Sequence, residues 1–163
     1  MQTSFEFDGW TPDELLEAFE QLPGALRSEL EDAADDIGVR IASAARENAP
    51  VDRGRLRSSI SHVVESVGET LVKIRVGSNV DQAAPQEFGT DPGHFPPVSE
   101  LRGWARRVLG DESAAYPIAR SIAETGLDAQ PFLGPALQEH IDWAMDRIND
   151  AVTAAFEAVG FDT

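Results

Sequence analysis

The spacing of the apolar residues constrains the fold of this 163-residue chain more than any other feature, because it changes twice along the sequence. In residues 25–49 and again in 131–160, apolar side chains recur every three or four positions, which predicts two long amphipathic helices. Between them, at Ser59–Val67 and Thr70–Val76, apolar and polar residues alternate, which indicates a β-hairpin with its turn at Gly68. Strands that cluster between helices, instead of alternating with them, favour an α+β fold.

We therefore expect a single α+β domain over residues 1–163. A small antiparallel sheet, made of a β-hairpin plus short strands, should be packed by two long amphipathic helices, with short extra helices. The expected segments are an N-terminal arm with a strand at Phe5–Phe7 and a short helix (1–24), the first long helix (25–49), the hairpin and a short strand leading into Glu87–Thr90 (58–90), a loop and short helices (91–130), and the C-terminal helix (131–160).

The expected helix ends carry recognisable capping residues. Thr11, Pro12 and Glu14 read as an N-cap, a proline at the first helical position and a capping box. The Pro-Gly pair at 23–24 should end this first helix near Leu22. Gly160 is placed as the C-terminal cap of the last helix. The apolar stripe of that helix is expected to consist of Leu137, Ile141, Met145, Ile148, Val152, Phe156 and Val159.

Composition excludes several classes of protein. The chain has 29 acidic and 13 basic residues, a formal net charge of -16, which disfavours binding to nucleic acid or to membrane surfaces. Such self-repulsion is screened at 1 M salt, where the Debye length is about 3 Å, so the composition is similar to that of proteins from salt-loving organisms. An acidic surface in a mesophile is the other interpretation. The absence of cysteine excludes disulfides and thiolate metal sites.

No catalytic, cofactor or metal motif is found in the sequence. His62, His94 and His140 fall on a predicted strand, a loop and a helix without ligand spacing. No phosphate loop, dinucleotide fingerprint or nucleophile elbow is present. We expect a protein that is not an enzyme and binds no cofactor or metal.

Positive charge is concentrated at one place, where Arg53, Arg55 and Arg57 occupy alternate positions. Pro50 should stop the preceding helix, and Gly54 is expected to adopt a positive φ angle. In an extended segment the three arginines would lie on one side. They could pair with carboxylates of their own domain, or they could contact an acidic neighbouring subunit. For the second case, the acidic segments Glu29–Asp36 and Asp142–Asp150 are the candidate partners.

Three blocks of sequence resemble the tail-completion, or head–tail joining (neck), protein family of long-tailed double-stranded DNA viruses. They are "APVDRGRLRSSI" (Ala49–Ile60), "EFGT" (Glu87–Thr90) and "PFLGPAL" (Pro131–Leu137). Two positions depart from the family pattern: Arg53 replaces a usual Thr or Ser, and Gln82 replaces an aromatic residue. The matching residues are Pro50, Gly54, Arg55, Leu56, Ser59, Ile60, Glu87, Phe88, Gly89, Thr90, Pro131, Phe132, Leu133 and Pro135.

The resemblance implies a structural virion protein of the head–tail neck, assembled in the host cytoplasm as a homo-oligomeric ring, with a hexamer favoured. Its partners would be the adjacent neck or connector proteins and the tail-tube or terminator proteins. Viral DNA would pass through the ring without sequence-specific binding, and no membrane is involved. The prolines and glycines of the motifs would fix turns. The expected packing residues are Leu56, Ile60, Phe88, Phe132 and Leu133.

Two other functions remain open at this point. A tail terminator or minor tail protein would share the virion context but occupy another place in the stack. An acidic inhibitor that mimics DNA belongs to a different class, and such a protein is usually a monomer or dimer.

Overall fold

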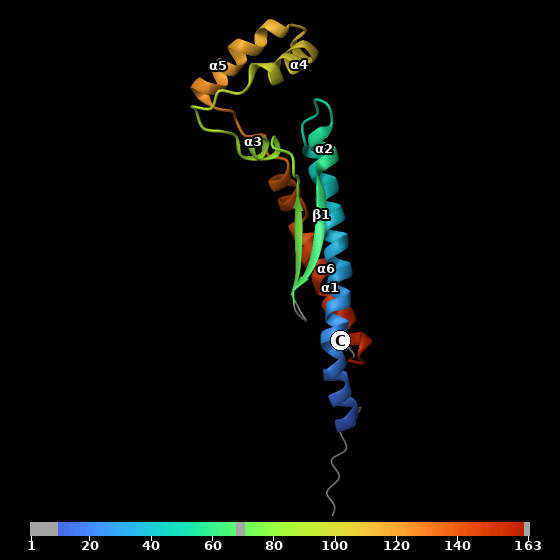
Figure 1. Cartoon of the computed structure of the whole chain (residues 1–163). Coiled ribbons are helices and arrows are strands. Elements are labelled where there is room, and N and C mark those ends of the chain that lie inside the picture. The colour runs from blue at the N-terminus through green and yellow to red at the C-terminus, as the bar shows by residue number, and fades with distance from the viewer. Residues whose placement is uncertain (1–9, 68–70, 162–163) are drawn as a thin grey trace, which may run out of the picture. The chain divides into compact units, whose positions relative to one another are not determined.

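The computed structural model of the chain describes residues 10–67 and 71–161 (Figure 1). It confirms the α+β class, because the described residues are mostly helical and contain one two-stranded antiparallel sheet. The expected strand at Phe5–Phe7 and the turn residue Gly68 lie outside the described residues. The elements are α1 (Pro12–Asn48), α2 (Arg55–Ser59), β1 (Ser61–Val67), β2 (Leu71–Gly77), α3 (Ala83–Phe88), α4 (Val98–Leu109), the 3-10 turn η1 (Glu112–Ala114), α5 (Ala115–Thr125) and α6 (Leu133–Ala158).

The chain divides into two compact units, and each draws on segments that are far apart in sequence. Unit 1 takes the described residues within 1–40, 62–76 and 140–163, and unit 2 takes residues 41–61 and 77–139. The long helices α1 and α6 each contribute one part to unit 1 and the other part to unit 2.

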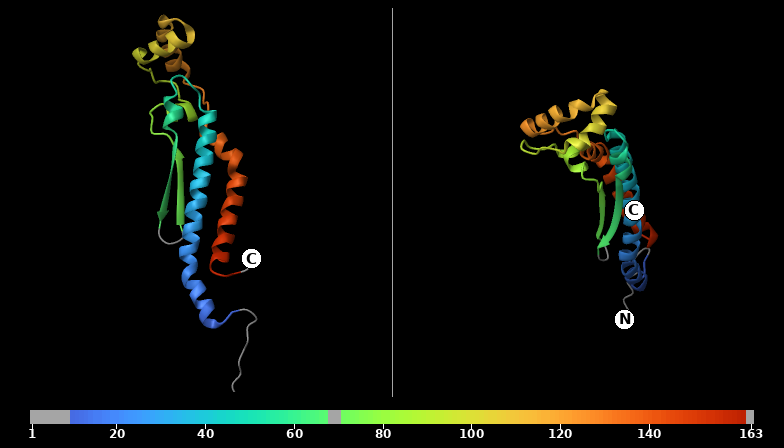
Figure 2. Two further views of the ribbon diagram at one scale, coloured as in Figure 1. Left: turned by 90° about the vertical axis from the view of Figure 1, so that its right-hand side faces the viewer. Right: turned by 45° about the horizontal axis from the view of Figure 1, so that its top comes forward.

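In unit 1 the hairpin, α1 and α6 run side by side (Figures 1 and 2). Alternate residues of β2 are half-buried and exposed, which confirms the two-residue period expected for this strand. Gly38 of α1 allows the helix to approach β1 closely, because a Cβ atom at this position would lie 2.5 Å from the His62 ring. The same ring bonds Asp35 through Nε2, at 2.8 Å from Oδ1, and so fixes the strand against the helix.

Alanines form most of the buried face of the long helices in unit 1. They allow close packing, since helix spacing follows the size of the side chains at the contact. Arg147 of α6 pairs with Asp36 of α1 at 2.9 Å, and the Arg40 guanidinium lies 4.3 Å from the ring centroid of Trp143. The buried residues of the two helices in this unit are Ala18, Ala33, Ala34, Ile37, Ala144, Ala151 and Ala155.

The stripe expected to be the apolar face of the C-terminal helix is only partly buried. Leu137, Ile141 and Met145 are about half exposed, at 48%, 48% and 54%. The buried positions in α6 are instead Ala136, Ala144, Ala151 and Ala155, which lie on a rotated face of the helix. The helix buries the face of small side chains, because that face permits the closest approach.

The first helix begins as expected and ends later than expected. Thr11 donates its N–H to Glu14 Oε2 at 2.8 Å, and Glu14 donates its N–H to Thr11 Oγ1 at 3.3 Å, which confirms the capping box. Pro23 and Gly24 do not end the helix, and α1 continues to Asn48. A proline inside a helix removes one backbone hydrogen bond at a cost of about 3 kcal/mol. Because helix-forming residues stand on both sides of Pro23, α1 continues through the proline.

The segment before Thr90 is a helix, α3, and not the expected short strand. Its sequence, AAPQEF, contains good helix formers, and Pro85 stands in the first turn, where a missing N–H is tolerated. Gly89 then ends α3 with φ at 73°. The two expected short helices of the 91–130 region are confirmed as α4 and α5, which pack on each other and on η1.

Candidate functional site

A single carboxylate joins the second and third motif blocks in unit 2. Glu87, at the end of α3, accepts hydrogen bonds from the backbone N–H groups of Phe132, Leu133 and Gly134, at 2.8, 2.9 and 2.8 Å. These groups open α6, and the first N–H groups of a helix have no partner within the helix. Glu87 therefore caps α6 from a distant part of the sequence, and its negative charge also suits the helix dipole.

The protonation of Glu87 follows from this geometry. Partial burial alone raises the pKa of a carboxyl, but the three N–H donors outweigh it and hold the pKa of Glu87 below its ordinary value. Glu87 is therefore charged at neutral pH, and its charge is used within the same chain.

A short bridge completes the joint between the second and third blocks. Thr90 and Leu127 exchange backbone hydrogen bonds of 3.0 and 3.1 Å. A Cβ atom at Gly89 would lie 2.5 Å from the Leu127 carbonyl oxygen, so this motif position requires glycine for space as well as for its positive φ. Gln130 also donates its N–H to the Gln86 carbonyl at 2.8 Å.

The first motif block closes the end of α1. Gly54 has φ at 73°, as expected, and Leu56 and Ile60 are buried, at 4% and 1% exposure. The Arg46 side chain donates to the Ile60 carbonyl at 2.7 and 3.1 Å. The amide of Asn48 donates to the Phe132 carbonyl at 3.5 Å, which links this block to the third.

The arginines of this block do not line an extended segment, because residues 55–59 form the short helix α2. Gly54 is the last residue of the bend at residues 52–54 and stands directly before the first residue of α2. The alternation of arginines with Gly54 and Leu56 therefore does not mark a strand. Arg57 donates to the Ala49 carbonyl at 3.1 Å and thereby caps the C-terminus of α1. Arg53 and Arg55 are exposed and form no hydrogen bond or ion pair with the described residues.

Among the expected packing residues, Phe88 is the exception. It is 80% exposed, whereas Phe132 is 2% exposed and Leu133 is half-buried. Glu87 faces the third block from the end of α3, and the next side chain along the helix points elsewhere. The motif thus combines an internal cap with an exposed aromatic side chain.

The basic residues of α4 could not be recognised as part of a site from the sequence, and the structure brings Arg107 beside Arg53. A Cβ atom at Gly103 would lie 3.2 Å from Arg53 Nη2 and 3.2 Å from Arg107 Nη1. Asp52 joins the two segments, because it accepts a 2.9 Å hydrogen bond from Arg107 Nε. The bonds from Arg107 lower the pKa of Asp52, and the charge of Arg53 acts in the same direction.

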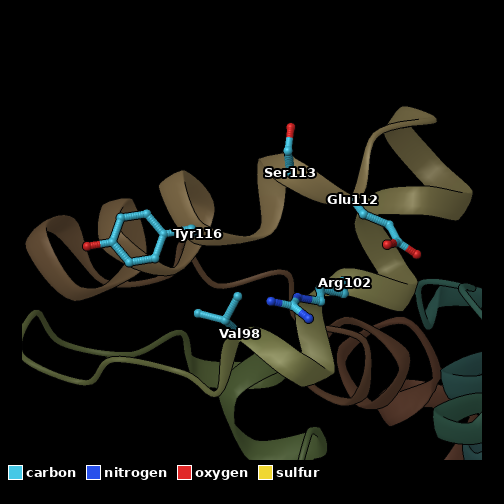
Figure 3. A pocket seen from close by; sticks show the side chains of 5 residues that line it. All are labelled: Val98, Arg102, Glu112, Ser113 and Tyr116. Carbon is cyan, nitrogen blue, oxygen red and sulfur yellow. The ribbon is translucent and has the colours of Figure 1, made fainter.

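Arg53 and Arg107 both approach Gly103, and we call these two, together with their sequence neighbours Arg55 and Arg102, the arginine cluster. Arg107 is paired with Asp52, while the other three have no ion pair with the described residues. Figure 3 shows Arg102 in an open hollow, with its guanidinium pointing into the space beside Val98. Ser113, which also lines this hollow, donates its hydroxyl to Asp111 at 2.7 Å.

The cluster belongs to the more basic part of the chain. Unit 2 holds eight of the 13 basic residues, a concentration visible in the sequence only after the units are known. They are Arg46, Arg53, Arg55, Arg57, Arg102, Arg106, Arg107 and Arg120.

The two acidic segments differ in how far their charges are used internally. In Glu29–Asp36, Glu31 binds Arg27 and Ser66, Asp35 binds His62, and Asp36 binds Arg147. In Asp142–Asp150, the three aspartates 142, 146 and 150 are exposed and form no ion pair with the described residues. The second segment therefore has more charge available for another molecule.

The described residues offer neither a candidate metal site nor a candidate membrane span. No group of three or more acidic, histidine or cysteine side chains there is arranged to hold a metal ion. No helix among them combines the length and the apolar character needed to cross a membrane.

Comparison with known proteins gives one match. Residues 13–89 match a family model described as "Bacteriophage HK97-gp10, putative tail-component". This range includes all of α1 except Pro12, the hairpin, the first motif block and α3, and it ends within the second block. Neither the curated proteins nor the solved structures produced a match. The match supports a structural component of a tailed phage particle. Over residues 13–89, therefore, the chain is similar to the HK97-gp10-like family of phage tail components.

Proposed function

We propose that this chain is a tail-completion protein, a subunit of a ring in the head–tail neck that joins the head connector to the tail tube. The family match supports a tail-related virion protein, and the resemblance of the three motif blocks favours a neck ring of six copies. In such a ring each subunit uses two different surfaces, which meet head to tail around the circle.

One observation carries the proposal: unpaired arginines are exposed on a chain of net charge -16. Copies of so acidic a chain repel each other unless their contacts have locally opposite charge. Arg53 and Arg55 supply that opposite charge, and Arg57 holds the end of α1 beside them. We therefore assign Arg53, Arg55 and Arg57 to the subunit interface, with Arg57 acting through the structure of its own subunit.

Assembly should depend on these arginines. Replacing Arg53, Arg55 and Arg57 by serine is expected to shift the purified chain from a ring toward monomer, with the largest change at low salt, where charge attraction is least screened. Size-exclusion chromatography with light scattering over a salt series measures this directly. Arg57→Ser alone is the matched control, because it removes the cap on α1 and leaves Arg53 and Arg55 in place.

Two outcomes would contradict the proposal. If the triple variant assembles like the parent at every salt concentration, the arginines serve only their own subunit. If the parent stays a monomer or dimer throughout, an acidic inhibitor becomes the better interpretation. A tail terminator or minor tail protein would also assemble, and electron microscopy of rings bound to isolated connectors or tails separates these positions.

The ring should also have an acidic lumen. Viral DNA has to pass without adhering, and carboxylates repel phosphate whereas arginines bind it. We expect acidic faces of a long helix or of loops to line the channel. A reconstruction of the ring by electron microscopy gives the surface potential of the lumen, and a strongly positive lumen would contradict this expectation.

A further inference from the structure

The exposed side of α6 in unit 1 has an unusual composition. Ile141 and Met145 stand one turn apart and are about half exposed, while the buried face of the helix is formed by alanines. Asp142 and Asp146, also exposed, lie beside them at the same spacing and form no ion pair with the described residues. We call Ile141, Asp142, Met145 and Asp146 the α6 stripe.

The arginine cluster of unit 2 has the opposite charge, and exposed apolar residues stand near it in the sequence. The ion pair of Asp52 with Arg107 holds two chain segments together, and exposed apolar residues adjoin it on both. Val51 precedes Asp52, while Val108 and Leu109 follow Arg107, and all three are more than half exposed. Unit 2 therefore carries exposed apolar side chains close in sequence to the members of the arginine cluster.

We propose that the α6 stripe of one subunit binds the arginine cluster of the next copy of this chain, with the Asp142 and Asp146 carboxylates paired to guanidinium groups and Ile141 and Met145 packed against Val108 and Leu109. This inference rests on the proposed ring. It names the surface on which the arginines dock.

Charge selects this pairing over the alternatives. Two copies of the α6 stripe placed face to face would oppose carboxylates, and two arginine clusters would oppose guanidinium groups, so a contact between identical surfaces is disfavoured. The contact between unlike surfaces is heterologous, and it closes into a ring when the rotation allows. The Glu29–Asp36 segment is the weaker candidate, because three of its acids already have partners within the subunit.

The lack of cysteine in the chain makes a direct test possible. Val108→Cys is introduced into a tagged copy and Met145→Cys into an untagged copy, so that the charged residues stay intact. The two proteins are mixed, allowed to assemble and oxidised. We expect a disulfide between tagged and untagged chains, with much less between copies of the same variant. Val63→Cys, which replaces a similarly exposed valine on β1, is the matched control in place of Met145→Cys.

Charge reversal supplies the second measurement. Asp142→Arg with Asp146→Arg should weaken assembly by at least about a hundredfold, since like charges would then meet at the contact. Adding Arg53→Asp and Arg55→Asp to the same chain should restore assembly in part. Circular dichroism of each variant checks that the subunit remains folded.

The outcomes distinguish this inference from the proposed function. Mixed disulfides together with rescue support the contact. Two results would overturn the α6 contact while leaving the proposed ring in place. In the first, rings form normally but Val63→Cys gives as much disulfide as Met145→Cys. In the second, rings still form when Asp142 and Asp146 are replaced by arginine. A parent chain that never assembles overturns both.

Discussion

Replacement of Phe132 by alanine is expected to lower the free energy of unfolding by about 3–5 kcal/mol, the usual loss for a fully buried phenylalanine. Phe132 is 2% exposed, and its backbone is held at both polar groups, by Glu87 at the N–H and by Asn48 at the carbonyl. These bonds limit how far the site can collapse to fill the space left by the ring. Urea denaturation followed by circular dichroism gives the value.

Phe88→Ala is the matched control, because Phe88 belongs to a neighbouring motif block and is 80% exposed. Its effect on the free energy of unfolding should stay within about 0.5 kcal/mol, as for surface substitutions generally. If the two alanine variants are equally destabilised, the assignment of Phe132 as the buried anchor is wrong.

Removal of the Glu87 carboxylate should have the second-largest effect. Glu87→Ala leaves three backbone N–H groups at the start of α6 without their acceptor, and a loss of about 1.5–3 kcal/mol is expected for hydrogen bonds to a charged group. Glu87→Gln, which keeps one oxygen acceptor and loses the charge, should fall between the parent and the alanine variant.

The same carboxylate gives stability a defined pH dependence. Because the folded-state pKa of Glu87 is lowered, its contribution is complete above the unfolded pKa of about 4.3 and is lost as the pH falls through the folded pKa. The stability difference between the parent and Glu87→Gln should therefore shrink as the pH is lowered below about 4. Glu139→Gln, on the exposed side of α6, is the control. A difference that stays constant from neutral to acidic pH would contradict the capping role.

Local sequence signals predicted much of the fold. The capping box of Thr11 and Glu14, the end of α1 before Pro50, the hairpin and the positive φ of Gly54 all depend on residues close together in the chain. Periodicity and turn chemistry describe such features well. The burial of Phe132 was also predicted, from its place in the resemblance to a known family.

The predictions that were wrong concern features that depend on packing between distant parts of the chain. Pro23 was expected to break a helix, but the helix continues through it. Ile141 and Met145 are exposed because α6 packs through a different face, which is formed by alanines. Alanine is only weakly hydrophobic, so a hydrophobicity pattern does not identify that face. The arginine cluster could not be found either, because its members come from segments about 50 residues apart, joined through Asp52 and Gly103.

The bridge between Thr90 and Leu127 has a consequence for how related chains can vary. It holds both ends of the segment that contains α4 and α5 at one point, and that segment packs mainly on itself. The entropy of closing a loop depends only weakly on its length, and doubling the length adds about 0.6 kcal/mol. We therefore expect insertions between these two residues to have a small thermodynamic cost, while the Glu87 cap outside the loop stays in place. The range matched by the family model ends at Gly89, immediately before this segment begins.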